Sequence, residues 1–284
     1  MLAPAKINLA LHVTGRRPDG YHLLDSLAVF TRFGDRLEIE PAEHDAFAIS
    51  GRYAAGLPLD SGNLVVKARD ALRREAGAGQ APPVAIRLEK NLPVASGVGG
   101  GSSDAAAALN GLARLWKLDI DSSSLARIGL SLGADLPMCL KGRPLVARGI
   151  GDELSPLNDF PSLGLVLVNP GVGVPTAEVF KALSNRENEA LPPLPERIDF
   201  HAIRNWLETT RNDLETAARS IQPAIGEALK ALKRADAAFA RMSGSGATCF
   251  GLFETGNVAK RAAVEIRARH PDWFVAATRS META

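Results

Sequence analysis

The segment from residue 93 to residue 109, PVASGVGGGSSDAAAAL, has the clearest chemical potential in this sequence. Its glycines at positions 97 and 99–101 allow the backbone to adopt positive φ angles and to approach a ligand closely. Ser102 and Ser103 follow where a helix is predicted to begin, so hydroxyl groups and free backbone amides gather at one point. A loop that leads into a helix N-terminus in this way is typical of a site for an anion, most often phosphate.

Two better-known phosphate loops do not fit this segment. A Walker A loop is excluded because no lysine follows the glycines, and a dinucleotide fingerprint would need glycine at position 102, where serine stands. The alternative is a flexible Gly/Ser linker before an Ala-rich helix. Linkers rarely run directly from a strand into a strong helix, so the pattern favours the anion site.

A second Gly/Ser turn, SGSGAT at residues 243–248, lies between a predicted helix and a predicted strand. It can form another backbone cradle for phosphate. Considered alone, it fits a structural helix C-cap better, because short Gly/Ser turns between a helix and a strand are common.

Near the N-terminus, Lys6 and Asn8 are two residues apart in a predicted strand, so both side chains can address one site. A lysine within an apolar strand is unusual because a buried ammonium needs a partner; the alternative is an edge-strand lysine that reaches water. Tyr21 and His22 follow a Pro-Asp-Gly turn and offer an aromatic face with ring nitrogens. For His22 the alternative is an ordinary structural histidine.

Asp135 is the last candidate. It follows Gly133 and precedes Pro137, so we expect it on a turn next to an apolar strand. A turn-capping role is the usual explanation for such an aspartate, and its position alone does not make it catalytic.

These residues need strands and helices to position them, and the hydrophobic periodicity predicts both in each half of the chain. The strands are expected at residues 7–13, 36–41, 84–90, 163–170 and 273–278. The helices are expected at residues 63–75, 104–116, 122–132 and 223–241, with others starting near Thr176, which can cap its own helix, and Val258. The fold class is therefore mixed α and β. Prolines and polar residues at 153–164 suggest a domain boundary, and a Pro-rich stretch at 190–199 is predicted to be a surface loop.

Composition sets the broad class. A chain of 284 residues fits one large or two ordinary domains, and 46% hydrophobic with 23% charged residues indicates a globular protein. The net charge of +1 provides no global attraction for nucleic acid or for an anionic membrane surface, and no apolar run is long enough for a membrane span. Two distant cysteines argue against a disulfide framework or a cysteine zinc site, and the N-terminus is not that of a signal peptide. We therefore expect a soluble, cytoplasmic protein.

Three of these segments together carry a resemblance. PAKINL, PVASGVGGGSSDAA and SGSGAT, in this order and at these separations, resemble the three signature motifs of the GHMP kinase superfamily. The long first motif with TGRRPDGYH, the triple glycine and LGADLP resemble the members that act on 4-diphosphocytidyl-2-C-methyl-D-erythritol. SGNLVVKA, GVGVPTAEVFKAL and RNDLETAA extend the similarity over nearly the whole chain. Departures are small: Val98 stands where leucine is usual, and Ala95 and Ser96 where glycine is more common.

The resemblance implies an α+β, two-domain GHMP-kinase fold. Its N-terminal, ATP-binding domain, here residues 1–155, contains a left-handed βαβ unit, which departs from the usual right-handed rule. Its C-terminal domain, here residues 156–284, is ferredoxin-like. The active site lies in the cleft between the two domains.

The resemblance also implies an activity: transfer of the ATP γ-phosphoryl group to the 2-hydroxyl of the substrate, a step of the methylerythritol phosphate route to isopentenyl diphosphate and dimethylallyl diphosphate. It gives Asp135 as the base and Lys6 as its cationic neighbour, with Mg²⁺ accompanying ATP. Tyr21 and Phe180 are expected to stack on the cytosine ring, His22 to bind its edge, and Asn8 and Thr176 to touch the substrate. The ATP-binding residues are expected to be Pro93, Val94, Ala95, Ser96, Gly97, Val98, Gly99, Gly100, Gly101, Ser102 and Ser103, with Asn63 and Lys90 near the adenine.

Two other functions are compatible with the motifs. A superfamily kinase for a small acceptor such as mevalonate, homoserine or a sugar would have no pyrimidine to stack, so Tyr21, His22 and Phe180 argue against it. A nucleotide-binding regulator without chemistry would be expected to lack Lys6 or Asp135, and both are present. The partner is then a small-molecule substrate, with no nucleic acid or membrane, and the protein is a monomer or a homodimer; the sequence identifies no magnesium ligands.

Overall fold

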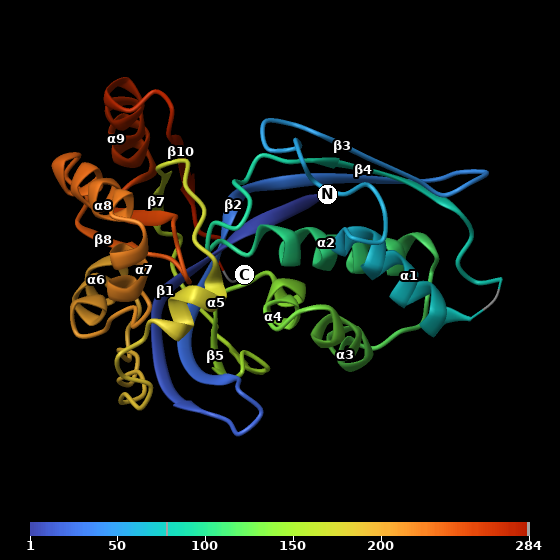
Figure 1. Ribbon diagram of the computed structural model, residues 1–284, viewed down its shortest axis with the longest axis horizontal. Helices are drawn as coiled ribbons and strands as arrows, with labels where there is room; N and C mark the ends of the chain where they lie inside the picture. The colour runs from blue at the N-terminus through green and yellow to red at the C-terminus, as the bar shows by residue number, and fades with distance from the viewer. Residues whose placement is uncertain (78, 283–284) are drawn as a thin grey trace. The chain divides into compact units, whose positions relative to one another are not determined.

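The computed structural model describes residues 1–77 and 79–282, which fold into two compact units (Figure 1). Unit 1 consists of Met1–Ala5, Gly34–Val94 and Gly99–Gly142; unit 2 consists of Lys6–Phe33, Ala95–Val98 and the chain from Arg143 onward. Two long paired strands, β1 (Leu2–Arg16) and β2 (His22–Pro41), run through both units. The units are therefore assembled from separated segments. Contiguous domains over residues 1–155 and 156–284 remain a prediction.

In unit 1, the second half of β2 forms a sheet with β4 (Val84–Glu89) and β3 (Ala46–Ser50), in the order β3-β4-β2. Strands β3 and β4 are parallel and are joined through α1 (Leu64–Ala76), which makes a βαβ unit. Helix α1 packs against α2 (Gly100–Leu115), and α4 (Leu136–Lys141) contacts both α2 and α3 (Ser122–Leu132). The loop that precedes α2 is thus held between a strand and a packed helix.

In unit 2, the first half of β2 pairs with β5 (Leu145–Gly149), and β5 pairs with β6 (Glu153–Pro156). A separate antiparallel sheet has the order β10-β7-β9-β8. The remaining bounds in this unit are β7 (Gly164–Asn169), α5 (Thr176–Lys181), α6 (Phe200–Glu208), α7 (Glu215–Ile221), α8 (Ala224–Arg234), β8 (Phe239–Met242), β9 (Cys249–Phe253), α9 (Gly256–Arg269) and β10 (Phe274–Arg279).

The order of the four-stranded sheet identifies its motif. Counted along the chain, the strands lie in the order fourth, first, third, second, and helices follow the first and the third strand. This is the βαββαβ arrangement of ferredoxin-like domains. The ferredoxin-like expectation for the C-terminal part is confirmed.

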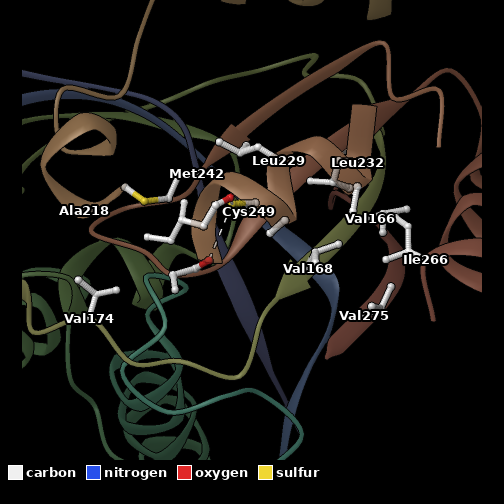
Figure 2. Packing of buried hydrophobic residues seen from close by; sticks show 14 of the residues in the cluster. Val166, Val168, Val174, Ala218, Leu229, Leu232, Met242, Cys249, Ile266 and Val275 are labelled. Carbon is white, nitrogen blue, oxygen red and sulfur yellow. Dashed lines mark hydrogen bonds between the residues drawn. The ribbon is translucent and has the colours of Figure 1, made fainter. Parts of the chain in front are cut away.

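The core of unit 2 lies against β7, all six residues of which are buried. Figure 2 shows Val166 and Val168 of this strand near Ile266, Val275 and Cys249, with side chains of α8 above them. Burying a valine or leucine side chain fully contributes roughly 1.5–3 kcal/mol, so this cluster supplies a large share of the stability of the unit. Both cysteines, Cys139 and Cys249, are buried, and neither forms a disulfide.

Two predicted elements are wrong. The helix predicted over residues 223–241 ends at Arg234, because Asp236 adopts a left-handed φ of 58° and turns the chain into β8. The apolar run after Asp135 is not a strand: it forms α4, with Pro137 in the first turn, where proline is favoured. A short apolar run fits a strand and a buried helix equally well.

For other elements the predicted type is confirmed, but the observed boundaries or caps differ from the prediction. Helix α2 begins at Gly100, four residues before the predicted start, so Gly100 and Gly101 belong to its first turn. The helix predicted to start at Thr176 does start there as α5, but the Thr176 side chain does not cap it. Residues 190–199 form a loop, as predicted. Among the described residues, no helix is both long and apolar enough to cross a bilayer.

Candidate active site

Strand β1, which carries Lys6, and the 243–248 turn both contact the middle of the Gly-rich loop, and the residues in contact all belong to unit 2. The Lys6 amide donates to the Val98 carbonyl at 2.9 Å, which joins β1 to the Gly-rich loop. The Thr248 amide donates to the Ser96 carbonyl at 3.0 Å, which joins the 243–248 turn to the same loop. The turn that could have been a simple helix cap therefore packs on the Gly-rich loop.

One buried hydroxyl connects all three segments. Ser243 Oγ accepts from the Asn8 amide at 3.1 Å and donates to the Gly97 carbonyl at 2.9 Å. Ser243 is fully buried, its bond with Asn8 is buried, and its bond with the half-buried Gly97 is partly so. We call these contacts among Asn8, Ser96, Gly97, Ser243 and Thr248 the neutral seam, because no ionised side chain takes part in them.

Glycine is required at position 97 of the seam. Its φ is +75°, and a Cβ there would lie 2.3 Å from the Ser243 carbonyl oxygen and 2.7 Å from the Gly246 nitrogen. Both of these atoms belong to backbone, which has little room to move. The glycine predicted for close approach of a ligand thus also permits close approach of another part of the chain.

The other end of the loop becomes the start of α2 in unit 1. Gly99 is the N-cap residue, with a left-handed φ of 64°, and has no side chain with which to cap the first amides. The first turn consists of Gly100, Gly101, Ser102 and Ser103. The buried Ser103 hydroxyl has no hydrogen-bond partner among the described residues. These groups can meet a phosphate at a helix N-terminus, where the helix dipole favours negative charge.

Aromatic residues predicted for the substrate come together in unit 2. The rings of His22 and Phe180 are stacked, with centroids 4.7 Å apart and an angle of 28° between the planes. Burial, and then the nearby Arg16 and Arg186, hold the pKa of His22 below its usual value, so the ring is neutral at pH 7. Its Nε2 atom is buried and lacks a partner in the described part of the chain, whereas Tyr21 is 56% exposed.

Asn8 and Thr176 also lie in unit 2. Asn8 is buried; its side-chain amide donates to Ser26 Oγ at 2.7 Å, while its Oδ1 atom has no partner within residues 1–77 and 79–282. The Thr176 hydroxyl lies 2.8 Å from the Ser245 hydroxyl, so the start of α5, the helix of Phe180, is bonded to the 243–248 turn.

The two predicted catalytic residues belong to different units. Lys6 is only 4% exposed, on β1 in unit 2. Asp135 is the N-cap residue of α4 in unit 1, but its carboxylate does not cap that helix. The turn-capping explanation for Asp135 therefore does not extend to the amides of α4. A direct role for this pair remains a prediction.

The two residues expected near the adenine have defined structural partners. Asn63 is the N-cap of α1, and its Oδ1 atom accepts from the Val65 amide at 2.9 Å. The Lys90 ammonium is buried between two carboxylates, those of Asp35 and Asp104, and lies 2.7 Å from an oxygen of Asp104. Contacts of either residue with adenine remain predictions.

Sequence reasoning missed Asp35, Asp104 and Ser243. A signal for Asp35 was present: it falls on the same face of its strand as Leu37, and Lys90 falls on the same face as Leu88, so two opposite charges stand on apolar faces. Asp104 and Ser243 stand within the glycine-bearing motifs, but nothing in those motifs shows that Asp104 bonds Lys90 or that Ser243 bonds Asn8 and Gly97.

The chain matches two family models. The model described as "GHMP kinases N terminal domain" matches residues 63–143, and "GHMP kinases C terminal" matches residues 189–272. The first match includes the Gly-rich loop with α2, and the second includes the whole 243–248 turn with the strands on either side of it.

Curated relatives and a solved structure match over nearly the full length. A protein of Mesorhizobium japonicum named 4-diphosphocytidyl-2-C-methyl-D-erythritol kinase is 75% identical over 281 residues, covering 99% of this chain and 95% of the relative. One of the same name from Brucella melitensis is 56% identical over 98% of this chain and 94% of the relative. A crystal structure of 4-(cytidine 5'-diphospho)-2C-methyl-D-erythritol kinase has a TM-score of 0.80 and 36% identity, covering 99% of both chains. A mevalonate kinase of L. major, at 17% identity and a TM-score of 0.69, shares the fold.

Proposed function

This chain belongs to the GHMP kinase family, and we propose that it transfers the γ-phosphoryl group of ATP to the 2-hydroxyl of 4-diphosphocytidyl-2-C-methyl-D-erythritol. The observation that supports this proposal most strongly is the 75% sequence identity to the Mesorhizobium japonicum kinase over 99% of this chain. The reaction is a step of the methylerythritol phosphate route to isopentenyl diphosphate and dimethylallyl diphosphate.

We propose that residues 93–103 hold the triphosphate of ATP. Phosphoryl transfer asks the protein mainly for positioning and for stabilisation of charge. The α2 N-terminus supports this role, because Gly99 leaves its amides without a capping side chain and the buried Ser103 hydroxyl has no other described partner. Asn63 and Lys90 are proposed to lie near the adenine.

We propose that Asp135 accepts the proton of the substrate hydroxyl while Lys6 stabilises the charge that develops on oxygen. A nearby ammonium also lowers the pKa of the carboxyl and so weakens the base. Because the transition state is loose, charge stabilisation and positioning outweigh that loss of basicity.

We propose that the cytidine part of the substrate binds at Tyr21, His22 and Phe180. The stacked pair of His22 and Phe180 supports a site for a flat ring, and the neutral His22 with its unpartnered Nε2 supports a hydrogen bond to the edge of that ring. The Asn8 Oδ1 atom is buried and unpartnered within the described residues, and it is proposed to receive a substrate hydroxyl together with Thr176.

Mg²⁺ is the expected companion of ATP, neutralising phosphate charge. The described residues contain no group of three or more His, Cys, Asp or Glu side chains that could hold a metal ion. This is compatible with magnesium, which retains several waters and takes most other ligands from the phosphates. We further propose a cytoplasmic protein that acts on a small molecule, binds no nucleic acid, and is a monomer or a homodimer.

An ADP-release assay with ATP and Mg²⁺ tests the acceptor. We expect turnover with 4-diphosphocytidyl-2-C-methyl-D-erythritol and none with mevalonate or homoserine. Turnover with a small acceptor alone would leave a kinase but refute the cytidine site. No turnover from folded protein that binds ATP would favour a regulator.

A single substitution tests whether Asp135 acts in catalysis and is not needed only for folding. Asp135→Asn is expected to lower kcat roughly 10²–10⁴-fold, the usual contribution of a general base. Wild-type turnover in a folded Asp135→Asn protein would refute the role of Asp135.

A further inference from the structure

A buried group of three ionisable side chains lies in unit 1, and we call Asp35, Lys90 and Asp104 the charged clasp. Lys90 Nζ bonds one oxygen of Asp35 and lies 2.7 Å from one oxygen of Asp104. The three side chains are 5% exposed for Lys90, 0% for Asp35 and 4% for Asp104. Ionisable groups so deep in a protein are costly to charge unless they are paired and hydrogen-bonded.

The sheet brings Asp35 and Lys90 together. In the antiparallel register of β2 and β4, Arg36 lies opposite Glu89, so the next pair in the same register is Asp35 with Lys90. Both residues point to the core side of their strands, and opposite charges at paired positions attract. Burial alone would lower the pKa of Lys90, but the two carboxylates raise it overall, so the ammonium stays charged.

Asp35 holds the chain that enters the Gly-rich loop. Its second oxygen, Oδ1, accepts the Asn91 amide at 2.6 Å and the Leu92 amide at 2.8 Å. These are the two residues directly before Pro93, where the loop begins. One carboxylate therefore binds the loop entry with one oxygen and Lys90 with the other.

Asp104 lies beyond the loop, within the first two turns of α2. Through Lys90 it is linked to Asp35, so the clasp connects the residues before the loop with the helix after it. A Cβ placed on Gly100 would lie 3.5 Å from Lys90 Nζ and 3.6 Å from an Asp35 oxygen. The clasp is thus in contact range of the first residue of α2, where the phosphates are proposed to bind.

We propose that Asp35 and Lys90 are positioning residues, which through Asp104 hold both ends of the Gly-rich loop in the conformation that binds the nucleotide. This rests on the proposed function of the loop as the ATP site. Lys90 acts here through the loop, because two of its three N–H donors are already bonded to carboxylates.

The other end of β4 offers a matched control. Asp45 accepts from Arg73 Nη2 at 2.9 Å and from the Val84 amide at 3.0 Å. Like Asp35 it is a carboxylate bonded to a cationic side chain and to backbone N–H, with one amide where Asp35 accepts two, but it lies at the start of β4 instead of beside the loop. Asp45→Asn and Asp35→Asn remove the same charge from similar bonds.

The test compares Asp35→Asn, Asp45→Asn, Asp104→Asn and Asp104→Leu with the wild type. The readouts are the thermal midpoint, the Kd of a non-hydrolysable ATP analogue by calorimetry, kcat and both KM values, and hydrogen exchange at Asn91 and Leu92 without nucleotide. For Asp35→Asn we expect the Kd and the KM for ATP to rise about tenfold or more, as when hydrogen bonds to a charged group are lost. The KM for the acceptor should change by less than about threefold, and exchange at both amides should accelerate.

The control and the conservative variant should behave differently. Asp45→Asn should lower the thermal midpoint but leave the Kd of the analogue within about threefold of the wild type. Asp104→Asn keeps an oxygen acceptor for Lys90 and should bind the analogue like the wild type, whereas Asp104→Leu removes the acceptor and should bind as weakly as Asp35→Asn.

An unchanged Kd in Asp35→Asn would overturn the proposal, as would an equal rise in Asp45→Asn, since the effect would then come from general destabilisation. If the wild type itself bound no analogue, the proposed function would fail; the exchange at Asn91 and Leu92 would then still decide whether the clasp holds the loop.

Discussion

The Gly-rich loop is held in two chemically different ways. In unit 1 its ends are bound by buried ionisable side chains, those of Asp35, Lys90 and Asp104. In unit 2 its middle is bound by a serine hydroxyl and backbone groups at the neutral seam. In the charged clasp, side-chain oxygens of Asp35 and Asp104 accept hydrogen bonds from Lys90, and another side chain with an oxygen can replace such an acceptor. The seam depends on backbone atoms in close contact, so it leaves no space for an added carbon. We therefore expect the loop to tolerate a change of charge in the clasp better than an added side chain at the seam.

We expect the largest loss of stability when an added side chain disrupts the neutral seam. Gly97→Ala places a Cβ against two backbone atoms and forces a residue with a side chain into a φ of +75°. We expect a loss of roughly 2–5 kcal/mol in the free energy of unfolding, measured by denaturant titration. Gly173→Ala is the control, because nothing lies within 4 Å of its Cβ position. Equal stability of the two variants would show that the seam is loose.

A smaller loss is expected when a hydrogen-bonding group is removed from the neutral seam. Ser243→Ala removes the hydroxyl and leaves the Gly97 carbonyl and the Asn8 amide without that partner, so the free energy of unfolding should fall by roughly 1–3 kcal/mol. Ser220→Ala removes an exposed hydroxyl that bonds only within its own helix and should change stability by less than about 0.5 kcal/mol. A loss as small in Ser243→Ala would mean that water replaces the hydroxyl.

The clasp should respond to pH where the seam does not. Burial is the main cause that raises the pKa of Asp104, to about 8 from its usual 3.8. Between these values the folded protein binds a proton that the unfolded chain has released, so the free energy of unfolding falls as the pH rises. The slope is at most about 1.4 kcal/mol per pH unit and ends above the folded pKa. Denaturant titrations from pH 5 to pH 9 should show this fall in the wild type but not in Asp104→Asn. Parallel curves for the two proteins would place the ionised carboxylate in the native state throughout.

The smallest effect distinguishes buried from exposed charge. Arg127 and Glu75 form an ion pair whose side chains are 67% and 39% exposed. Arg127→Ala should change the free energy of unfolding by less than about 1 kcal/mol, and salt should reduce even that difference. If Arg127→Ala proved as costly as Asp35→Asn, burial would not be what gives the clasp its strength.

Most elements could be predicted from the sequence because their patterns are local. The alternating strand at 84–90 and the helix at 122–132 lie where expected, to within a residue. The helix predicted to reach Arg241 failed because nothing in its propensity announces the left-handed turn at Asp236. The strand predicted after Asp135 was wrong because an apolar run of five residues fits the period of a strand as well as that of a helix.

The candidate site divides in the same way. Glycine spacing predicted the loop, and the position of Tyr21 and His22 after a turn predicted an aromatic surface. The partners of that loop could not be predicted. Asp35 meets Lys90 only through the register of two strands, and Ser243 meets Gly97 across 146 residues of sequence. Motif resemblance indicated that these segments belong together, but not which atoms bond.

The seam also sets a time order for the growing chain. Asn8 bonds Ser243 across 235 residues, and the Gly-rich loop lies between them in the sequence. Synthesis proceeds from the N-terminus at roughly 5–20 residues per second, so the loop leaves the ribosome several seconds before the turn that completes its support. An unfinished chain can form α2 and the clasp, but it lacks the seam. The full set of bonds that supports the loop can therefore form only after residue 248 has been synthesised.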